Sequence, residues 1–378
     1  MPKHQERVRE MMLMKPICSI SVACFVALVA TRAFALETNT QQSDFGAGPI
    51  NIRVTACLVA NRSHVASPCA EPQVSQSSDK AEQVASRIAR AWYFLDMQQL
   101  EKARDEADLA LAVDPDDVKA RHLAARISLT LTDLPRAEAD LEVALKQAPD
   151  DADIKTTHAI ILQTKNASFQ SLREFQAVIR EHPDHLYARE QAALLCMRFG
   201  WYEVALANLN FVIERRVTTK LLTERADAFL ALDRPQSAAA DLSAALEQEP
   251  DNPFLMKARA EAYAKGGMHD LALRDYDTLL ATDRGAPIHI MLADEHAKLL
   301  TKRAFSYAKL RRFDDAVNDV ITAIGLGGTQ VILRTQILLR RSGFSDIPLD
   351  GHDSPALRRA LTACFGLDAC FQGIMKSI

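Results

Sequence analysis

VASRIARAWYFLDMQQLEKARDEADLALAVDPDD, residues 84–117, is followed without a gap by VKARHLAARISLTLTDLPRAEADLEVALKQAPDD, residues 118–151. Each block has 34 residues, and a fixed period of this length is the mark of a repeat protein. The apolar positions and the prolines of the two blocks coincide when one is laid on the other. The pairs are Leu129 on Leu95, Leu134 on Leu100, Ala137 on Ala103, Ala144 on Ala110 and Pro149 on Pro115.

Each block predicts two helices joined by a turn. Apolar residues recur at helical spacing, polar residues interrupt the pattern at mid-block, and the spacing then resumes until Asp-Pro-Asp-Asp. Proline ends the second helix because it lacks a backbone donor and disfavours α geometry in the residue before it. Alanines such as Ala91, Ala103 and Ala110 fit the places where two helices must approach closely. The chain is therefore expected to be all-α.

The pattern resembles the tetratricopeptide repeat. This resemblance implies a right-handed superhelical solenoid of helix-turn-helix units over 84–328, ending in a small helical C-terminal cap. An insertion at 285–296 separates the last two units; we favour a loop there over a lip covering one end of the groove. The seven expected units are 84–117, 118–151, 152–185, 186–218, 219–252, 253–284 and 297–328.

In this family the first helices line a concave groove, and positions 2, 5, 9, 12 and 13 of each unit tend to face it. Basic residues modestly outnumber acidic ones at the matching positions. The expected partner is therefore a protein or peptide segment with acidic residues and a few apolar anchors. The alternative is that these are ordinary solvated side chains. The groove candidates are Lys119, His122, Arg126, Tyr187, Arg198, Lys220, Phe254, Lys257, Lys265, Lys298, Phe305 and Lys309.

One specialised groove is excluded by the residues themselves. Units that clamp a terminal carboxylate carry a basic residue followed four positions later by asparagine. No unit of this chain has asparagine at that later position. The residues found there are Arg126, Ile160, Leu194, Asp227, Glu261 and Phe305.

The amino-terminal segment, residues 1–35, is expected to be a secretory signal peptide. It has a basic start, an apolar run from Ile17 to Ala30, and Ala33-Phe34-Ala35 before the expected cleavage. A membrane anchor is disfavoured because the run is shorter than the roughly 20 residues that cross a bilayer. A lipoprotein site at Cys24 is disfavoured because the apolar run continues past it. We expect export to the periplasm or cell envelope of a bacterium, with no stable membrane span after cleavage.

Removal of this leader leaves 40 basic and 47 acidic residues from the 45 and 49 of the whole chain, a net charge of 40 − 47 = −7. This balance argues against nucleic-acid binding, which requires a strongly basic surface. Residues 36–83 are polar and lack periodicity, which predicts a flexible segment. Export favours disulfides, and the candidate pairs are Cys364 with Cys370 and Cys57 with Cys69. Cys196 is expected to be a buried small apolar residue.

The last segment, 329–378, departs from the repeat period. Its order of a helix, a Gly-Phe turn, Leu-Asp-Gly and a second helix resembles the small peptidoglycan-binding domain of cell-wall proteins. The resemblance implies a glycan-binding tail, although Ser354, Leu357 and Cys364 depart from the family pattern. The alternative is a cap that covers the last repeat. The candidate glycan-binding residues are Gln336, Phe344, Asp350 and Gly351.

Enzymatic constellations are missing from the sequence, which has no phosphate-binding glycine loop, nucleophile elbow, HExxH or CxxC. His182 and His185 flank a turn, but no further ligand is spaced to complete a metal site. We therefore expect neither a cofactor nor a metal, and no enzymatic activity. The first hypothesis is an exported interaction scaffold that binds a partner in its groove. The alternative is an envelope protein tethered to peptidoglycan by its tail.

Overall fold

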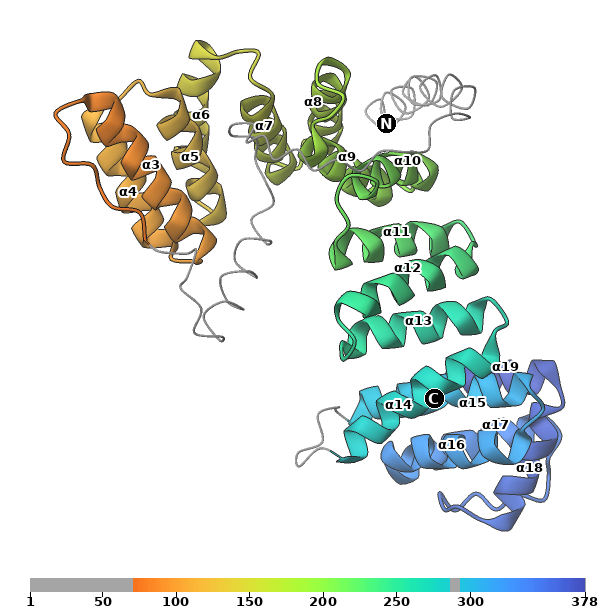
Figure 1. The fold of residues 1–378 in the computed structure, drawn as a ribbon. Coiled ribbons are helices and arrows are strands. Elements are labelled where there is room, and N and C mark those ends of the chain that lie inside the picture. The colour runs from red at the N-terminus through yellow and green to blue at the C-terminus, as the bar shows by residue number, and fades with distance from the viewer. Residues whose placement is uncertain (1–70, 286–292, 378) are drawn as a thin grey trace, which may run out of the picture. The chain divides into compact units, whose positions relative to one another are not determined.

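The computed structural model describes residues 71–285 and 293–377, and within them every regular element is an α-helix (Figure 1). This confirms the predicted fold class. The signal peptide, most of the polar segment, Cys57 and Cys69, and the middle of the insertion lie outside the described residues. The chain divides into two units, 1–199 and 200–378. Each unit is described separately.

The first unit is a run of helix hairpins in which each helix packs on the next along the chain. The helix α3 also packs on α5, and α5 on α7, so the first helices of successive hairpins are neighbours. The helices are α3 (Lys80–Asp96), α4 (Leu100–Val113), α5 (Val118–Thr130), α6 (Leu134–Gln147), α7 (Ala152–Thr164), α8 (Ser168–Glu181) and α9 (Leu186–Arg198).

The second unit continues with the same hairpin pattern and ends in three helices outside the repeat period. The helices are α10 (Tyr202–Ile213), α11 (Thr219–Ala231), α12 (Pro235–Gln248), α13 (Pro253–Lys265), α14 (His269–Gly285), α15 (Ala293–Lys309), α16 (Phe313–Leu326), α17 (Gly328–Arg341), α18 (Pro355–Phe365) and α19 (Asp368–Ser377).

Small residues fill the crossing points inside the hairpins. Ala91, Ala103 and Ala110 are fully buried in the first hairpin and its junction with the second, because a larger side chain would hold the backbones apart. In the α7–α8 hairpin, Ser171 and Val178 replace two of the expected alanines and are also fully buried. The helices α7 and α8 therefore still approach closely, although their sequence departs from the family pattern at these two positions.

The turn inside each hairpin uses one residue with a left-handed backbone. Such a residue reverses the chain within a short turn, and it is strained unless it is glycine. The residue that follows it directly precedes the second helix; Asp133, for example, accepts a hydrogen bond from the Arg136 backbone N–H at 3.3 Å. These left-handed residues are Gln98, Thr132, Asn166, Gly200, Asp233, Gly267 and Arg311, with φ between 57° and 75°.

The acidic ends of the repeats begin the next helix. The Asp117 carboxylate accepts a hydrogen bond from Ala120 N–H at 2.7 Å, and Asp151 accepts one from Ile154 N–H at 2.9 Å. These carboxylates satisfy backbone donors that the first helical turn leaves unpaired. The Asp-Pro-Asp-Asp sequence thus ends one helix and caps the following one.

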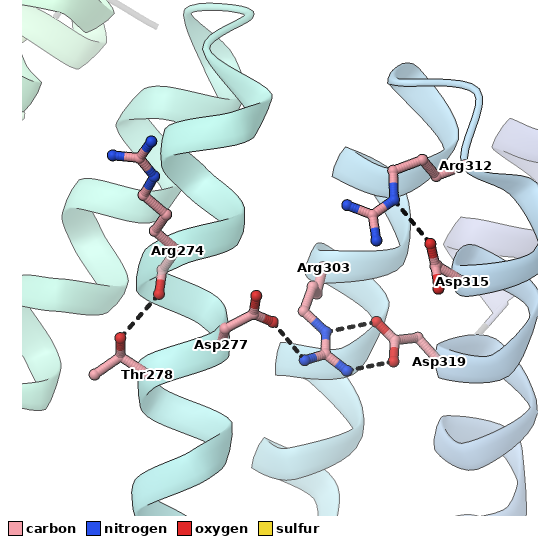
Figure 2. Close-up of polar contacts among 7 residues, drawn as sticks. All are labelled: Arg274, Asp277, Thr278, Arg303, Arg312, Asp315 and Asp319. Carbon is pink, nitrogen blue, oxygen red and sulfur yellow. Dashed lines mark hydrogen bonds and ion pairs between the residues drawn. The ribbon is translucent and has the colours of Figure 1, made fainter.

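In the second unit, an arginine of each first helix is joined to an aspartate of the second helix 16 residues later. The Arg303 guanidinium donates to both Asp319 oxygens at 2.7 and 2.6 Å and to Asp277 at 2.7 Å (Figure 2). Arg225 with Asp241 and Arg259 with Asp275 repeat this paired geometry. The three aspartates are nearly buried, so these pairs fix how the two helices of a hairpin meet.

The C-terminal helices share one hydrophobic core with the last repeat. Val320 and Ile324 of α16 belong to the same buried cluster as Leu339 of α17, Leu361 of α18 and Phe371 of α19. The end of the last repeat is therefore covered, as a repeat array requires.

Candidate partner-binding surface

The twelve groove candidates all lie on the first helices of hairpins, and none is buried. In the first unit they fall on α5 and α9, and in the second on α11, α13 and α15. Phe254 is the most open of the large apolar side chains in the described residues, with 81% of its surface exposed. Each candidate keeps some exposure, although Phe305 is partly covered by the C-terminal helices.

A polar cluster surrounds Arg126 in the first unit. The Arg126 guanidinium lies 4.5 Å from the centre of the Trp92 ring, so that α5 and α3 meet in a cation–π contact. One turn before Arg126, His122 Nε2 lies 2.7 Å from the Thr157 hydroxyl of α7. That hydroxyl donates its hydrogen to the Asp153 carbonyl at 3.0 Å, so it accepts the His122 Nε2–H.

The charges of this cluster are set by burial. Burial and the neighbouring Arg126 cation lower the pKa of His122 to about 4, although Asp153 and Asp151 oppose the shift. His122 is therefore neutral near pH 7. Burial also lowers the pKa of the Arg126 guanidinium, while Tyr187, Asp153 and Asp96 act in the opposite direction through space. Arg126 keeps its charge at neutral pH because the pKa of a guanidinium lies far above neutral pH.

The nearby Asp153 carboxylate already has a partner. His185 Nδ1 accepts the Ala188 N–H at 3.0 Å as the cap of α9, which leaves its Nε2–H to donate to Asp153 Oδ1 at 3.0 Å. This hydrogen bond lowers the pKa of Asp153 and holds its side chain toward His185. His185 is thus a capping and positioning residue.

Four of the five lysine candidates of the second unit are paired with acidic residues of the chain. Lys257 lies 3.1 Å from Glu295, and Lys298 lies 2.6 Å from Asp294 and 3.1 Å from Glu295. The excess of basic residues predicted for this face is therefore largely balanced by local acids. Two further lysines are similar: Lys220 lies 3.6 Å from Glu224, and Lys265 lies 3.3 Å from Asp233 and 2.6 Å from the Leu230 carbonyl oxygen.

Phe305 belongs to the core of the C-terminal cap rather than to an open face. Its ring stacks on Phe371 of α19 at 5.6 Å and meets His269 edge to face at 6.0 Å. Lys309 Nζ lies 5.4 Å from the same ring. A partner would therefore meet Lys309 at this end of the array, with Phe305 partly covered beneath it.

Three of the four tail candidates, Gln336, Asp350 and Gly351, are joined by hydrogen bonds in one turn. The Gln336 side chain is fully buried, and its Nε2 donates to Asp350 at 2.8 Å and to the His352 carbonyl at 3.0 Å. Its Oε1 accepts the backbone N–H groups of Asp350 and Gly351 at 3.1 and 2.9 Å. Gln336 therefore has no surface to offer a glycan, which corrects that part of the prediction. Phe344 packs partly buried against the cap core.

Cys364 and Cys370 are joined by a disulfide between α18 and α19. Both cysteines are within the cap core, where Cys364 is fully buried. Cys196 is also buried, at 1% exposure, in agreement with its apolar surroundings in the sequence.

Two contributors to the Arg126 cluster were missed by the sequence analysis. Trp92 occupies position 9 of the first unit and Asp153 position 2 of the third, and the position rule had not been applied to these units. The same rule would have found both residues. The Arg–Asp pairs were also missed, although Arg225, Arg259 and Arg303 each have an aspartate 16 residues later.

Within residues 71–285 and 293–377, no three His, Cys, Asp or Glu side chains are grouped to hold a metal ion. None of the helices in these ranges combines the length and apolar character needed to cross a bilayer.

Comparison with known proteins supports the repeat assignment. The sequence model of the tetratricopeptide repeat matches residues 88–152 and 223–287, so the chain carries tetratricopeptide repeats. No curated protein is significantly similar to the sequence.

Several solved structures are similar to this chain at low sequence identity. A thermophilic tetratricopeptide repeat protein of Thermus thermophilus is 20% identical, with a TM-score of 0.42, and the match covers 48% of this chain and 99% of that one. PilF of Pseudomonas aeruginosa is 15% identical, with a TM-score of 0.48, covering 55% and 95%. A tetratricopeptide repeat protein of Parabacteroides merdae is 14% identical, with a TM-score of 0.41, covering 74% and 98%.

Proposed function

We propose that this protein is an exported, non-catalytic scaffold of the cell envelope that binds a protein or peptide partner on the first helices of its repeats. Repeat hairpins bury one face against their neighbours and offer the other to a partner, so function resides on that surface. The export step rests on the signal-like sequence of residues 1–35 alone.

The observation that carries this proposal is the exposure of the predicted face. Phe254, an aromatic side chain on α13, leaves 81% of its surface open although a monomer gains nothing by exposing it. Aromatic and arginine side chains dominate the binding energy at protein interfaces. Trp92, Arg126 and Tyr187 supply the same residue types on the first helices of the first unit.

The test is affinity capture from envelope extracts with the full chain as bait. Phe254→Asp should lose specific partners, because it places a charge where an apolar anchor would be buried. The matched control is Leu109→Asp, which changes an exposed apolar side chain on the second helix α4, where 44% of Leu109 is open. A partner list unaltered by Phe254→Asp, or altered equally by both variants, would remove the proposal.

The alternative, a protein tethered to peptidoglycan by its tail, is supported by the Leu-Asp-Gly turn and the helix that follows it. The burial of Gln336 and the shared core with the last repeat argue against it. Sedimentation of the full chain with purified peptidoglycan distinguishes the two functions. Pelleting that is weakened by replacing the exposed His352 and Asp353, and unchanged in Phe254→Asp, would favour the tether.

A further inference from the structure

Arg126 differs from the other arginines that stack on aromatic rings in the second unit. Arg225, Arg259 and Arg303 lie 5.9, 5.8 and 5.6 Å from ring centres, and each also holds an aspartate through two hydrogen bonds. Arg126 lies 4.5 Å from its ring, a distance within the range that arginines of the second unit show. Among the residues that the structure describes, however, its guanidinium has neither a hydrogen-bond acceptor nor a carboxylate within ion-pair distance.

The surroundings of Arg126 do not supply the missing anion. Asp153 is the nearest candidate on α7, but His185 holds its carboxylate at 3.0 Å, and Asp96 acts only through space. His122 is neutral and donates to Thr157. Arg126 is partly exposed, and none of its nitrogen atoms is among the buried side-chain atoms without a partner, so its donors are accessible in the isolated protein. They can pair with a carboxylate that arrives with matching geometry.

We infer that the Arg126 guanidinium, which lies over the Trp92 ring, is the receptor for a side-chain carboxylate of an extended acidic segment in the bound partner. This inference rests on the proposed function and identifies the chemistry of its partner. A planar guanidinium binds a carboxylate through two parallel hydrogen bonds.

A side-chain carboxylate fits better than a terminal one. The first helices lack the asparagine that accompanies a basic residue in units that clamp a chain end. The neutral His122 adds no second positive charge beside Arg126, so the site matches one carboxylate rather than a doubly charged group. Tyr187, which acts on Arg126 from α9, provides a second aromatic side chain near the same position.

The paired lysines of the second unit are unsuitable for this role. Lys298, for example, would have to release Asp294 and Glu295 before it could bind a partner's carboxylate, and the exchange would gain little. Charge complementarity with an acidic partner is therefore concentrated at Arg126. Lys298 provides a control, because its neutralisation lowers the total charge equally without touching the Arg126 cluster.

The test begins with a library of random 12-residue peptides displayed on phage and selected on the full-length protein. The selected peptides should be enriched in Asp and Glu when Arg126 is present, and the enrichment should be lost with Arg126→Gln but kept with Lys298→Gln. One selected peptide is then synthesised with its key acidic residue as Glu or as Gln, each with a free or an amidated carboxyl end.

Binding is measured for each protein and peptide combination. Glu→Gln in the peptide should weaken binding to the wild type about tenfold and leave binding to Arg126→Gln nearly unchanged, because a coupling between contacting charges disappears when either is absent. Amidation of the peptide end should have little effect. Arg126→Lys should recover only part of the affinity, since an ammonium cannot bind two oxygens in one plane.

The outcomes separate this inference from the proposed function. If peptides bind but the Glu→Gln loss is equal in wild type and Arg126→Gln, the inference is wrong and the scaffold function stands. If amidation rather than Glu→Gln abolishes binding, the receptor is for a chain end and the inference is also wrong. If no peptide is selected, both proposals are contradicted. An intact fold is checked by Arg126→Gln having the circular dichroism spectrum of the wild type and a cooperative unfolding transition.

Discussion

At the scale of single residues, the most informative positions are buried polar groups without partners. The Ser171 hydroxyl occupies an alanine position of the repeat, is fully buried, and has no hydrogen-bond partner in the described part of the chain. Ser171→Ala removes an unsatisfied group and improves helix propensity, so it should raise the free energy of unfolding by about 1 kcal/mol. Urea denaturation followed by circular dichroism measures this change.

The control for that variant is Ser243→Ala. The Ser243 hydroxyl donates to the Ala239 carbonyl at 2.8 Å within α12, so its removal has no unsatisfied group to relieve. Ser243→Ala should leave stability within about 0.5 kcal/mol of the wild type. Equal stabilisation by both variants would mean that helix propensity, not the buried hydroxyl, is responsible.

The lowered pKa of His122 predicts how the stability of the first unit depends on pH. Its pKa is about 4 in the folded chain against 6.5 as the reference value, so the unfolded chain binds more protons between these values. The stabilisation from neutral His122 is complete above pH 6.5 and is lost as the pH falls toward 4. By pH 5 the loss should reach about 2 kcal/mol.

The measurement compares urea unfolding of wild type and His122→Gln at pH 7 and pH 5. The glutamine retains a donor for Thr157 and does not titrate, while all other groups titrate in both proteins. The stability difference between wild type and variant should therefore shift against the wild type at pH 5. A difference that is independent of pH would show that His122 is not held neutral by its surroundings.

The location of binding candidates could be predicted from the sequence, but their partners could not. The repeat period determines which positions lie on a first helix, and all twelve candidates do so. Ion pairing depends on contacts between repeats. Lys257 donates a hydrogen bond to Glu295, which lies 38 residues later in the chain, within the insertion at 285–296. A position rule has no information about such a contact, so it counted charges that are already balanced.

At the scale of the helix hairpin, the recurring left-handed turn residue determines where strain is located. Thr132 adopts φ 61°, a conformation that a β-branched side chain tolerates poorly. The equivalent position is glycine at Gly200 and Gly267, with φ of 74° and 75°. Thr132→Gly should therefore stabilise the protein by about 1 kcal/mol, as measured by thermal and urea denaturation.

The matched change is Thr130→Gly, two residues earlier at the end of α5. Thr130 has helical geometry and its hydroxyl donates to the Arg126 carbonyl at 3.0 Å, so glycine there adds freedom to the unfolded chain, removes this hydrogen bond and should destabilise by about 0.5–1 kcal/mol. The two substitutions are chemically identical and opposite in expected sign. If both substitutions lower the free energy of unfolding, the left-handed backbone at Thr132 does not destabilise the wild type.

The arginine–aspartate pair inside a helix hairpin leads to a second prediction at the hairpin scale. Burial opposes the charge of Arg303, but its hydrogen bonds and charge contact with Asp319 outweigh that effect and raise the guanidinium pKa. Arg303→Ala leaves a nearly buried Asp319 without its partner, and it should lower the free energy of unfolding by about 3 kcal/mol. Chemical denaturation of the purified variant measures the loss.

The neighbouring pair in Figure 2 provides the comparison. Arg312 donates to Asp315 at 2.8 Å, but both side chains are about half exposed, and the pair lies within a single turn of chain. Arg312→Ala should therefore lower the free energy of unfolding by less than about 1 kcal/mol. A loss as large as that of Arg303→Ala would show that exposure does not separate the two pairs.

Helix existence was predictable because apolar spacing and turn residues are local signals. The residues at which the helices begin and end were less predictable. The helix α3 begins at Lys80, capped by Asp79, before the block that the period defines from Val84. The helix α15 begins at Ala293, as the helix-compatible run from Ala293 to Leu310 predicts, although the period alone places the unit at 297–328. A cap or a continuing helix depends on one hydrogen bond or one neighbouring helix, and neither contributes to the period.

At the scale of the whole chain, the C-terminal segment is the part that sequence patterns describe least well. Its resemblance to a peptidoglycan-binding domain suggests an independent tail, whereas its apolar residues complete the core of the last repeat. The Phe305–Phe371 contact joins residues far apart in the chain, and it cannot be derived from either helix alone. Removing 329–378 would expose this core, so a truncated chain is a poor test of tail function.

The Asp350–Gly351 turn packs on α17 within the cap and gives the last prediction. Gly351 has φ 69°, and a Cβ added there would overlap the Thr329 Cγ2 and lie 3.0 Å from the Thr329 carbonyl oxygen. Gly351→Ala should therefore lower the free energy of unfolding of the second unit by about 3 kcal/mol, from left-handed strain and overpacking together. Hydrogen exchange resolved by helix should show the loss in α17, α18 and α19.

Two further variants separate the two causes of the Gly351→Ala destabilisation, which are backbone strain and steric overlap. Gly343 also has a positive φ, 101°, but a Cβ there meets nothing within 4 Å, so Gly343→Ala should show the backbone strain without the clash, about 1 kcal/mol. Thr329→Ala removes Cγ2, so adding it to Gly351→Ala should restore part of the lost stability.

Because the cap and the last repeat share a core, protection from hydrogen exchange in α15 and α16 should fall together with that of the cap in Gly351→Ala. If α15 and α16 stay fully protected in Gly351→Ala, the C-terminal segment folds as a separate domain and the tethered-tail function regains its structural basis.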